Sequence, residues 1–139
     1  MKLEVTREDV WAGTMEDQPG ELATKLRALA DAGVNLEFVI ARRKDQASGK
    51  GVVFVTPVPG GQQAAAKKEG FSRAEGLHSV RVVANDEAGL GAKLAEHLAA
   101  AGINLRGFSG ASLGDKAVLH FALDDEAMAD KARDLLSEL

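Results

Sequence analysis

The chain has 139 residues, of which 45% are hydrophobic and 4% aromatic, and 17 basic against 21 acidic residues give it a formal net charge of -4. This composition is typical of a globular protein of one ordinary domain or two very small ones. The negative charge and the few aromatic side chains disfavour binding to nucleic acids or anionic membranes, and we expect neither kind of partner. The absence of cysteine excludes disulfides, thiol nucleophiles and cysteine-based zinc sites.

The sequence carries no sign of export or membrane insertion. It has no run of about 18 apolar residues, and its start, MKLEVTREDV, lacks the apolar stretch of a secretion signal. We therefore expect a cytoplasmic protein.

In chain order, the first expected elements are two strand-like runs and a helix. MKLEV alternates Leu3 and Val5, and VWAGTM at 10–15 is strand-like. A helix is predicted over 19–32, because Pro19 suits the first helical position and Gly33 suits the residue after a helix end. Its apolar stripe consists of Leu22, Leu26 and Leu29.

A hairpin and a second helix follow. VNLEFVIARR at 34–43 and GVVFVTPV at 51–58 read as strands joined by the polar KDQASGK. GQQAAAKKE at 61–69 predicts a short helix, and FSRA at 71–74 a short strand. Trp11 is interpreted as sheet packing rather than a stacking platform.

The same order of elements then repeats. HSVRVVA at 78–84 predicts a strand, and a helix stripe follows with Leu90, Leu94, Leu98 and Ala101. INLRGFSGAS at 103–112 and KAVLHFAL at 116–123 predict a tighter hairpin, and DDEAMADKARDLLSEL at 124–139 predicts the last helix.

The repeat can be seen directly in the amino-acid sequence. Residues 17–36, DQPGELATKLRALADAGVNL, align without gaps to residues 86–105, DEAGLGAKLAEHLAAAGINL, with nine identities in twenty. The chain is therefore predicted to be α+β, with two ferredoxin-like βαββαβ units in tandem, at 6–75 and 76–139. The second repeat lacks a fourth strand, so we hypothesise that residues 1–5 fill its vacant edge.

These motifs resemble the ACT domain, the regulatory module of amino-acid-metabolic enzymes, and the tandem arrangement is similar to the stand-alone members of that family. D-x-P-G opens the first helix, and A-G-V-N or A-G-I-N leads into the second strand of each unit. The resemblance implies antiparallel sheets side by side with helices on one face, a homodimer, and an amino acid bound where one unit's loop faces another unit's second strand.

The resemblance also implies two sets of ligand-binding residues. The first set is Asp17, Gln18, Pro19, Gly20, Glu21 and Leu22, with Asn35, Leu36, Glu37 and Phe38 on the facing strand. The second set is Asp86, Glu87, Ala88, Gly89 and Leu90, with Asn104, Leu105, Arg106, Gly107 and Phe108. Ala88 in place of proline weakens the match of the second set.

Physical chemistry permits this interpretation and leaves alternatives open. A helix N-terminus offers free N–H groups to a carboxylate, and Asp17 could receive an ammonium group. Against this, Gly20 and Gly89 could serve turn geometry alone, Asp17 and Asp86 could cap helices, and asparagines after a helix commonly bond local backbone.

Other motifs in the sequence give weaker evidence of a function. AGLGAKL lacks the third glycine of a dinucleotide fingerprint, and GFSGA lacks the final glycine of a nucleophile elbow. His78, His97 and His120 have no metal-ligand spacing and are interpreted as surface residues. The charge run ARRKD at 41–45 is interpreted as a solvated loop rather than a phosphate or partner contact.

We therefore expect a regulatory protein without catalytic activity, cofactor or metal, which binds a small amino-acid-like ligand. The alternative is a ligand-free interaction module that regulates an enzyme or a transcription factor. A small enzyme on the same fold is a third class, and it would need a convergent catalytic cluster that the sequence does not display.

Overall fold

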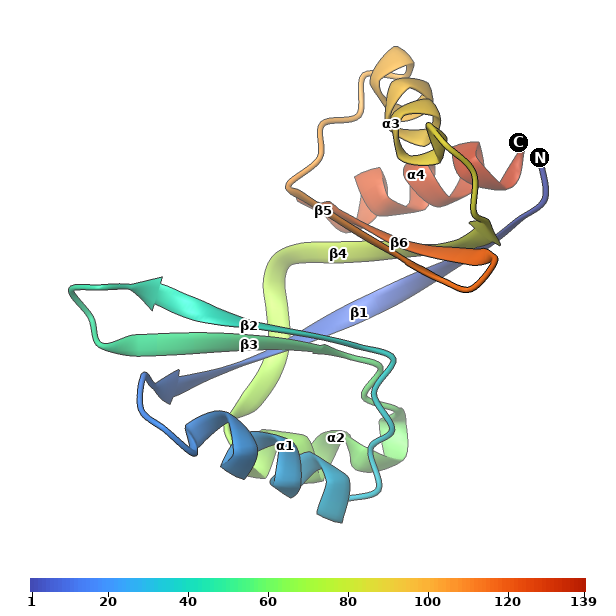
Figure 1. The fold of residues 1–139 in the computed structure, drawn as a ribbon. Helices are drawn as coiled ribbons and strands as arrows, with labels where there is room; N and C mark the ends of the chain where they lie inside the picture. The colour runs from blue at the N-terminus through green and yellow to red at the C-terminus, as the bar shows by residue number, and fades with distance from the viewer. The chain divides into compact units, whose positions relative to one another are not determined.

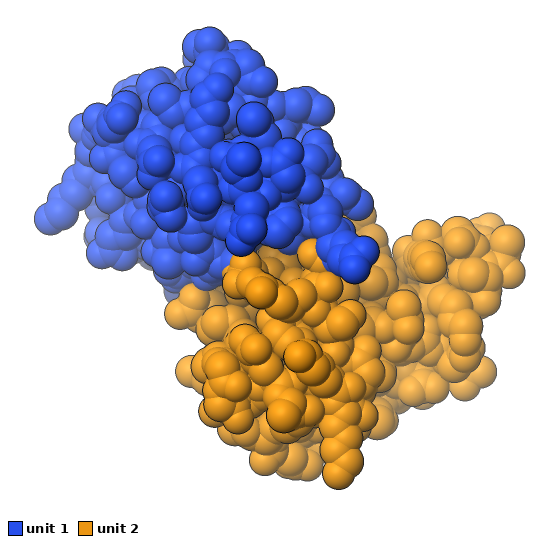
Figure 2. Space-filling model, turned by 180° about the vertical axis from the view of Figure 1, so that it is seen from behind, with its two compact units in different colours: residues 1–8, 75–139 blue, residues 9–74 orange.

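A computed structural model describes residues 1–139 in full, and they form two compact units (Figures 1 and 2). Unit 1 consists of Met1–Glu8 together with Glu75–Leu139, and unit 2 of Asp9–Ala74. Unit 2 thus holds the first copy of the repeat and unit 1 the second. Two long strands, β1 (Leu3–Glu16) and β4 (Phe71–Asn85), contribute residues to both units.

Unit 2 is a four-stranded sheet with two helices on one face. Its strand order is β2-β3-β1-β4, where β2 is Phe38–Asp45 and β3 is Lys50–Thr56. The antiparallel register places Trp11 of β1 beside Val55 of β3, and Val55 beside Val39 of β2. The helices are α1 (Glu21–Asp31) and α2 (Gln63–Lys68), the latter preceded by the 3₁₀ turn Gly60–Gln62.

Unit 1 repeats this arrangement with strands from both ends of the chain. Its order is β1-β4-β6-β5, with β5 at Gly107–Leu113 and β6 at Lys116–Leu123. The helices α3 (Leu90–Ala100) and α4 (Glu126–Ser137) lie on one face of these strands (Figure 1). Each unit is therefore α+β with antiparallel strands, as the repeated βαββα pattern predicted.

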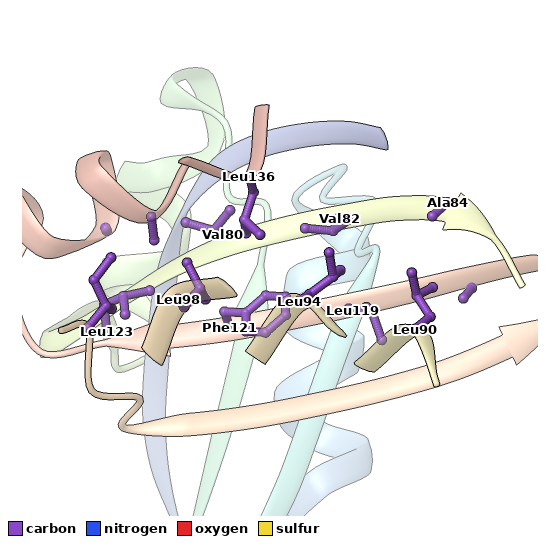
Figure 3. Close-up of a cluster of buried hydrophobic side chains, with 14 residues drawn as sticks. Val80, Val82, Ala84, Leu90, Leu94, Leu98, Leu119, Phe121, Leu123 and Leu136 are labelled. Carbon is purple, nitrogen blue, oxygen red and sulfur yellow. The ribbon is translucent and has the colours of Figure 1, made fainter. Parts of the chain in front are cut away.

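Each unit has its own hydrophobic core. In unit 1, the apolar stripe of α3 packs on β4 and β6: Leu94, Leu98, Val82 and Phe121 are fully buried (Figure 3). Leu3 and Val5 of β1 are half-buried and pack against this same cluster. In unit 2, the core contains Trp11, Leu29, Val53, Val55, Val58, Ala66 and Phe71. The packing role predicted for Trp11 is confirmed.

Two predicted strand breaks were wrong. MKLEV and VWAGTM are parts of one 14-residue strand, and FSRA and HSVRVVA are parts of one 15-residue strand. Ion pairs accompany the intervening polar residues: Arg7 bonds Asp130 on α4 at 3.0 Å, and Asp9 pairs with Arg73 on β4. Because β1 is hydrogen-bonded to strands on both sides, the charged segment continues the strand.

The predicted element starts also need correction. α1 begins at Glu21 rather than residue 19, so Pro19 lies in the preceding turn. β2 begins at Phe38 and β5 at Gly107, several residues later than predicted, because the chain must first leave the helix through Gly33 and Gly102, both at positive φ. ARRKD lies in strand β2 rather than in a loop.

The histidines are less exposed than predicted. All three are half-buried, and the side chain of His120 is only 12% exposed, with its Nδ1 3.5 Å from Oε2 of the buried Glu8. Glu8 lies on β1 and His120 on β6, so strand neighbours far apart in sequence create a contact that no local pattern indicates. No helix in the chain combines the length and hydrophobicity that a membrane-spanning segment requires.

Candidate functional site

The loop between β1 and α1 is shaped by a glycine at the helix N-cap. Gly20 has φ of +89°, the left-handed region that only glycine enters cheaply, and a Cβ there would meet nothing within 4 Å. Its carbonyl accepts the first helical bond, from the backbone N–H of Thr24 at 3.0 Å. The N–H groups of Leu22 and Ala23 therefore have no acceptor within the helix.

Asp17 is an ion-pair partner rather than a helix cap. α1 has no side-chain cap, so the capping interpretation of Asp17 was wrong. Its Oδ2 instead accepts a hydrogen bond from Nε of Arg43 at 2.7 Å, with side chains 39% and 71% exposed, respectively. Its backbone N–H donates to the carbonyl of Gly49 at 2.9 Å, which fixes the loop against the β2–β3 turn.

A cavity of about 210 Å³ lies beside this loop in unit 2. Its walls come from the end of β1, the loop, the first turn of α1, and the middle of the hairpin. The lining residues are Met15, Glu16, Asp17, Gln18, Glu21, Leu22, Ala41, Arg42, Arg43 and Gly51. Gly51 lets the Met15 side chain pack closely, because a Cβ there would lie 3.2 Å from the Met15 methyl group.

The cavity has an apolar floor and a charged rim. Met15, Leu22 and Ala41 are half-buried and pack against the unit 2 core. Glu16 pairs with Lys50, which leaves half-buried Glu21 as the lining carboxylate with no ion pair. Because successive strand residues point to opposite faces, the side chains of Arg42 and Arg43 lie on opposite faces of the sheet. Arg43 is the guanidinium that reaches Asp17.

The structure brings together part of the first predicted set. Asp17, Gln18, Glu21 and Leu22 line the cavity, while Pro19 and Gly20 shape the turn beside it. Asn35, Leu36 and Glu37 lie in the loop before β2, and Phe38 is the first residue of that strand. The stretch of β2 that faces the loop is three residues further on, at 41–43.

The second predicted set has the same backbone and different chemistry. Gly89 caps α3 with φ of +83°, and Asp86 donates its N–H to Asp115 at 2.8 Å, as Asp17 does to Gly49. Glu87 and Ala88 are exposed residues of the same loop. The counterparts of Glu21, Arg42 and Arg43, however, are Leu90, Ala111 and Ser112. Leu90 is buried in the core of unit 1, and Ala111 with Ser112 leaves the β5 side of this loop without the charges of β2.

The remaining members of the second set have structural contacts. Asn104, Leu105 and Arg106 lie in the loop before β5, and Arg106 donates to the carbonyl of Gly76 at 2.8 Å. Gly107 begins β5, and the ring of Phe108 lies 5.0 Å from that of Phe121. A Cβ on Gly91 would be 3.4 Å from the Phe108 ring, so this ring covers the first turn of α3.

Sequence reasoning missed the strand residues of the cavity. Met15, Glu16, Ala41, Arg42, Arg43 and Gly51 were not among the predicted ligand contacts. The signal that could have found Arg43 is its charge at a strand position where the second repeat has serine. No group of three or more histidine, aspartate or glutamate side chains is arranged to hold a metal ion.

Comparisons with known proteins identify the fold. No protein-family model and no curated protein sequence matches the chain. Among solved structures, a protein from Bacteroides thetaiotaomicron superposes with a TM-score of 0.78 at 16% identity, over 96% of this chain and 89% of that chain. The ligand-free regulatory subunit of aspartate kinase from Thermus thermophilus superposes with a TM-score of 0.71 at 16% identity, over 99% and 97%.

A third match extends the same pattern. The regulatory subunit of aspartate kinase from Thermus flavus has a TM-score of 0.65 at 18% identity, over 99% of this chain and 96% of that chain. These regulatory subunits are ACT-domain proteins. The resemblance noted in the repeat is thus confirmed at the level of the fold, and the chain has the tandem ACT-domain fold.

Proposed function

We propose that this protein is a non-catalytic regulatory protein that binds an amino acid, or a molecule of similar size and charge, in the unit 2 cavity. The observation that carries this proposal is the composition of the cavity wall. A glycine-capped helix start, the unpaired carboxylate of Glu21 and the guanidinium of Arg43 line one space.

Each part of an amino acid has a complement in this cavity. The N–H groups at the start of α1 and the helix dipole suit a carboxylate, and Arg43 adds a positive charge beside them. Glu21 and Asp17 suit an ammonium group, and Met15 with Leu22 suits an apolar side chain. At about 210 Å³ the cavity is smaller than the roughly 300–1,000 Å³ of drug-sized sites, which favours a small ligand.

The regulated partner is proposed to be an enzyme or a transcription factor. Support comes from the likeness to regulatory subunits of aspartate kinase over nearly the whole chain. The residues that line the cavity also include no serine, threonine, cysteine, histidine or lysine that could act as a nucleophile.

A thermal-shift panel of the common amino acids tests the proposal. A ligand at 100 times its Kd stabilises the folded state by about 2.7 kcal/mol, which is a shift of several degrees for a small protein. We expect one member or one chemical class of the panel to produce such a shift. If no amino acid shifts the melting temperature at millimolar concentration, the protein is instead the ligand-free interaction module.

A further inference from the structure

One pair of facing strand residues forms part of the floor of the unit 2 cavity. Met15 of β1 lies opposite Gly51 of β3 in the antiparallel register, and both residues line the cavity. The Met15 side chain rests on the glycine, because a Cβ on Gly51 would lie 3.2 Å from the Met15 methyl carbon and 3.4 Å from its Cγ. The glycine therefore provides the space in which the methionine lies close to the strand.

The side chains beside Met15 on this floor are also apolar. Leu22 of α1 and Ala41 of β2 line the same cavity, and all three side chains are half-buried against the core of unit 2. A methionine side chain is unbranched and has three rotatable bonds, so it adapts to the shape of what contacts it. The floor therefore suits an apolar group and contains one adjustable side chain.

The charges around the cavity are largely matched to one another. Glu16 pairs with Lys50, and Asp17 pairs with Arg43. The carboxylate of Glu21 has no ion pair, and it suits the α-ammonium group that every amino acid carries. Once that group is bound, no unpaired charge on this face of the sheet remains for a charged ligand side chain, and burying such a charge without a partner is costly.

The corresponding positions of unit 1 are packed core. Ala84 occupies the place of Met15 in the repeat, and it lies opposite Ala117 of β6. Leu90 occupies the place of Glu21. All three residues are buried in the same hydrophobic cluster. A methionine opposite a glycine thus distinguishes the unit that has the cavity from its repeat.

We propose that the ligand of the unit 2 cavity is an α-amino acid with an uncharged aliphatic side chain, and that Met15 and Gly51 set the greatest length of that side chain. This inference rests on the proposed function and names the class of amino acid that the site selects. The ligand side chain lies against Met15, Leu22 and Ala41, where each buried methylene raises the affinity about fourfold. The gain ends where the side chain meets the methionine.

The first test needs no variant of the protein. Titration calorimetry on the wild-type chain compares alanine, α-aminobutyrate, norvaline and norleucine, which differ by one methylene each. The affinity should rise about fourfold per methylene up to a limiting length. Lysine is norleucine with a terminal ammonium group, and it should bind about tenfold or more weakly than norleucine, because its charge has no partner on the floor.

The second test changes the floor by one methyl group. In Gly51→Ala the new Cβ has the backbone carbonyl of Arg42 3.4 Å away on one side, so the flexible Met15 side chain must move into the cavity. The longest ligand side chain that still gains affinity should then be one methylene shorter, while alanine keeps its wild-type affinity. The control Ala117→Gly changes one methyl group at the equivalent place of unit 1 and should leave the whole series unchanged. Circular dichroism checks that each variant is folded.

A third measurement observes the methionine itself. The chain has three methionines, Met1, Met15 and Met128, so methyl-labelled methionine gives three resonances in a nuclear magnetic resonance spectrum of the wild-type protein. Met15→Leu identifies the resonance of Met15. Saturation with norvaline should shift that resonance and leave those of Met1 and Met128 in place, because only Met15 lines the cavity.

The proposal is overturned if lysine binds as tightly as norleucine, if folded Gly51→Ala keeps the wild-type limit of length, or if the Met15 resonance stays in place with a ligand bound. Each of these results still shows an amino acid bound to the protein, so the proposed function survives them. If no amino acid binds at all, the proposed function fails, and the proposal fails with it.

Discussion

At the scale of single residues, the loop before α1 and the loop before α3 have similar backbones but different neighbouring side chains. Asp17 and Asp86 both begin a loop that ends in a left-handed glycine, and both anchor their N–H on the opposite hairpin. Only Asp17 meets a guanidinium, because Arg43 is replaced by Ser112 in the second copy. Within the loops, the sequence separates the two copies only by features such as Ala88 in place of Pro19, whereas the charged contact comes from a strand residue 26 positions away from Asp17.

Asp17→Asn and Asp86→Asn form a matched pair that isolates this difference. Removing the exposed pair with Arg43 should cost less than about 1 kcal/mol of unfolding free energy. If Asp17 receives the ligand ammonium, Asp17→Asn should weaken binding of the amino acid found in the panel about tenfold or more, since the lost charge-assisted bond contributes about 1.5–3 kcal/mol. Asp86→Asn should leave the affinity unchanged. Titration calorimetry measures the affinity of both variants for the amino acid, and equal losses of affinity would refute the role of Asp17 in binding the ammonium group.

At the scale of elements, the two repeated helices bury different faces. α3 buries Leu90, Leu94 and Leu98, whereas α1 has Glu21 and Lys25 at the first two of these places. Glu21 lines the cavity. Lys25 donates to the carbonyl of Glu69 at 2.8 Å, and its Nζ lies 5.7 Å from the centre of the Phe71 ring. The apolar stripe of α1 is therefore rotated relative to that of α3, because Glu21 and Lys25 occupy two of the equivalent positions with side chains that make polar contacts.

The presence of lysine at position 25 and of leucine at the equivalent position 94 leads to a prediction about stability. Leu94→Ala removes a fully buried side chain and should lower the free energy of unfolding by about 2–5 kcal/mol. Lys25→Ala, at the equivalent place, removes a half-buried side chain with one hydrogen bond and should cost about 0.5–1.5 kcal/mol. Urea denaturation of the two variants measures the difference, and similar costs would contradict the account of the rotated stripe.

Helix and strand types were predictable from sequence, and the continuity of the long strands was not. Leu90, Leu94 and Leu98 indicate their helix face without any structure. The segment 6–9 carries four consecutive polar residues, and its place in a strand depends on neighbours that are distant in sequence, including the partners Asp130 and Arg73. The same holds for the cavity: its loop was predicted from a local motif, while Arg43 and Gly51 reach it through strand pairing.

At the scale of the whole molecule, unit 1 is assembled from both ends of the chain. Residues 1–8 group with residues 75–139, and Leu3 and Val5 pack on the core of that unit. The first part of β1 therefore supplies a strand to unit 1, while its second part pairs with β3 in unit 2. The missing fourth strand of the second repeat indicated this placement of residues 1–5 from the sequence, whereas the individual core contacts of Leu3 and Val5 could not be predicted from MKLEV alone.

Hydrogen exchange tests this assembly. Leu3→Ala/Val5→Ala should lower the unfolding free energy by roughly 1–3 kcal/mol, because both side chains are half-buried. Protection should fall in β6 and α4 and stay unchanged in β2 and α1. The control Glu4→Ala/Thr6→Ala changes exposed residues of the same strand and should leave both units protected. Loss of protection confined to β2 and α1 would refute the assignment of residues 1–8.

The binding stoichiometry of the amino acid that stabilises the protein tests the central claim most directly. Titration calorimetry on the wild-type chain should give one ligand per chain, because Glu21 and Arg43 of unit 2 have only Leu90 and Ser112 as counterparts in unit 1. Two equivalent sites per chain, or no heat from any amino acid, would contradict the account.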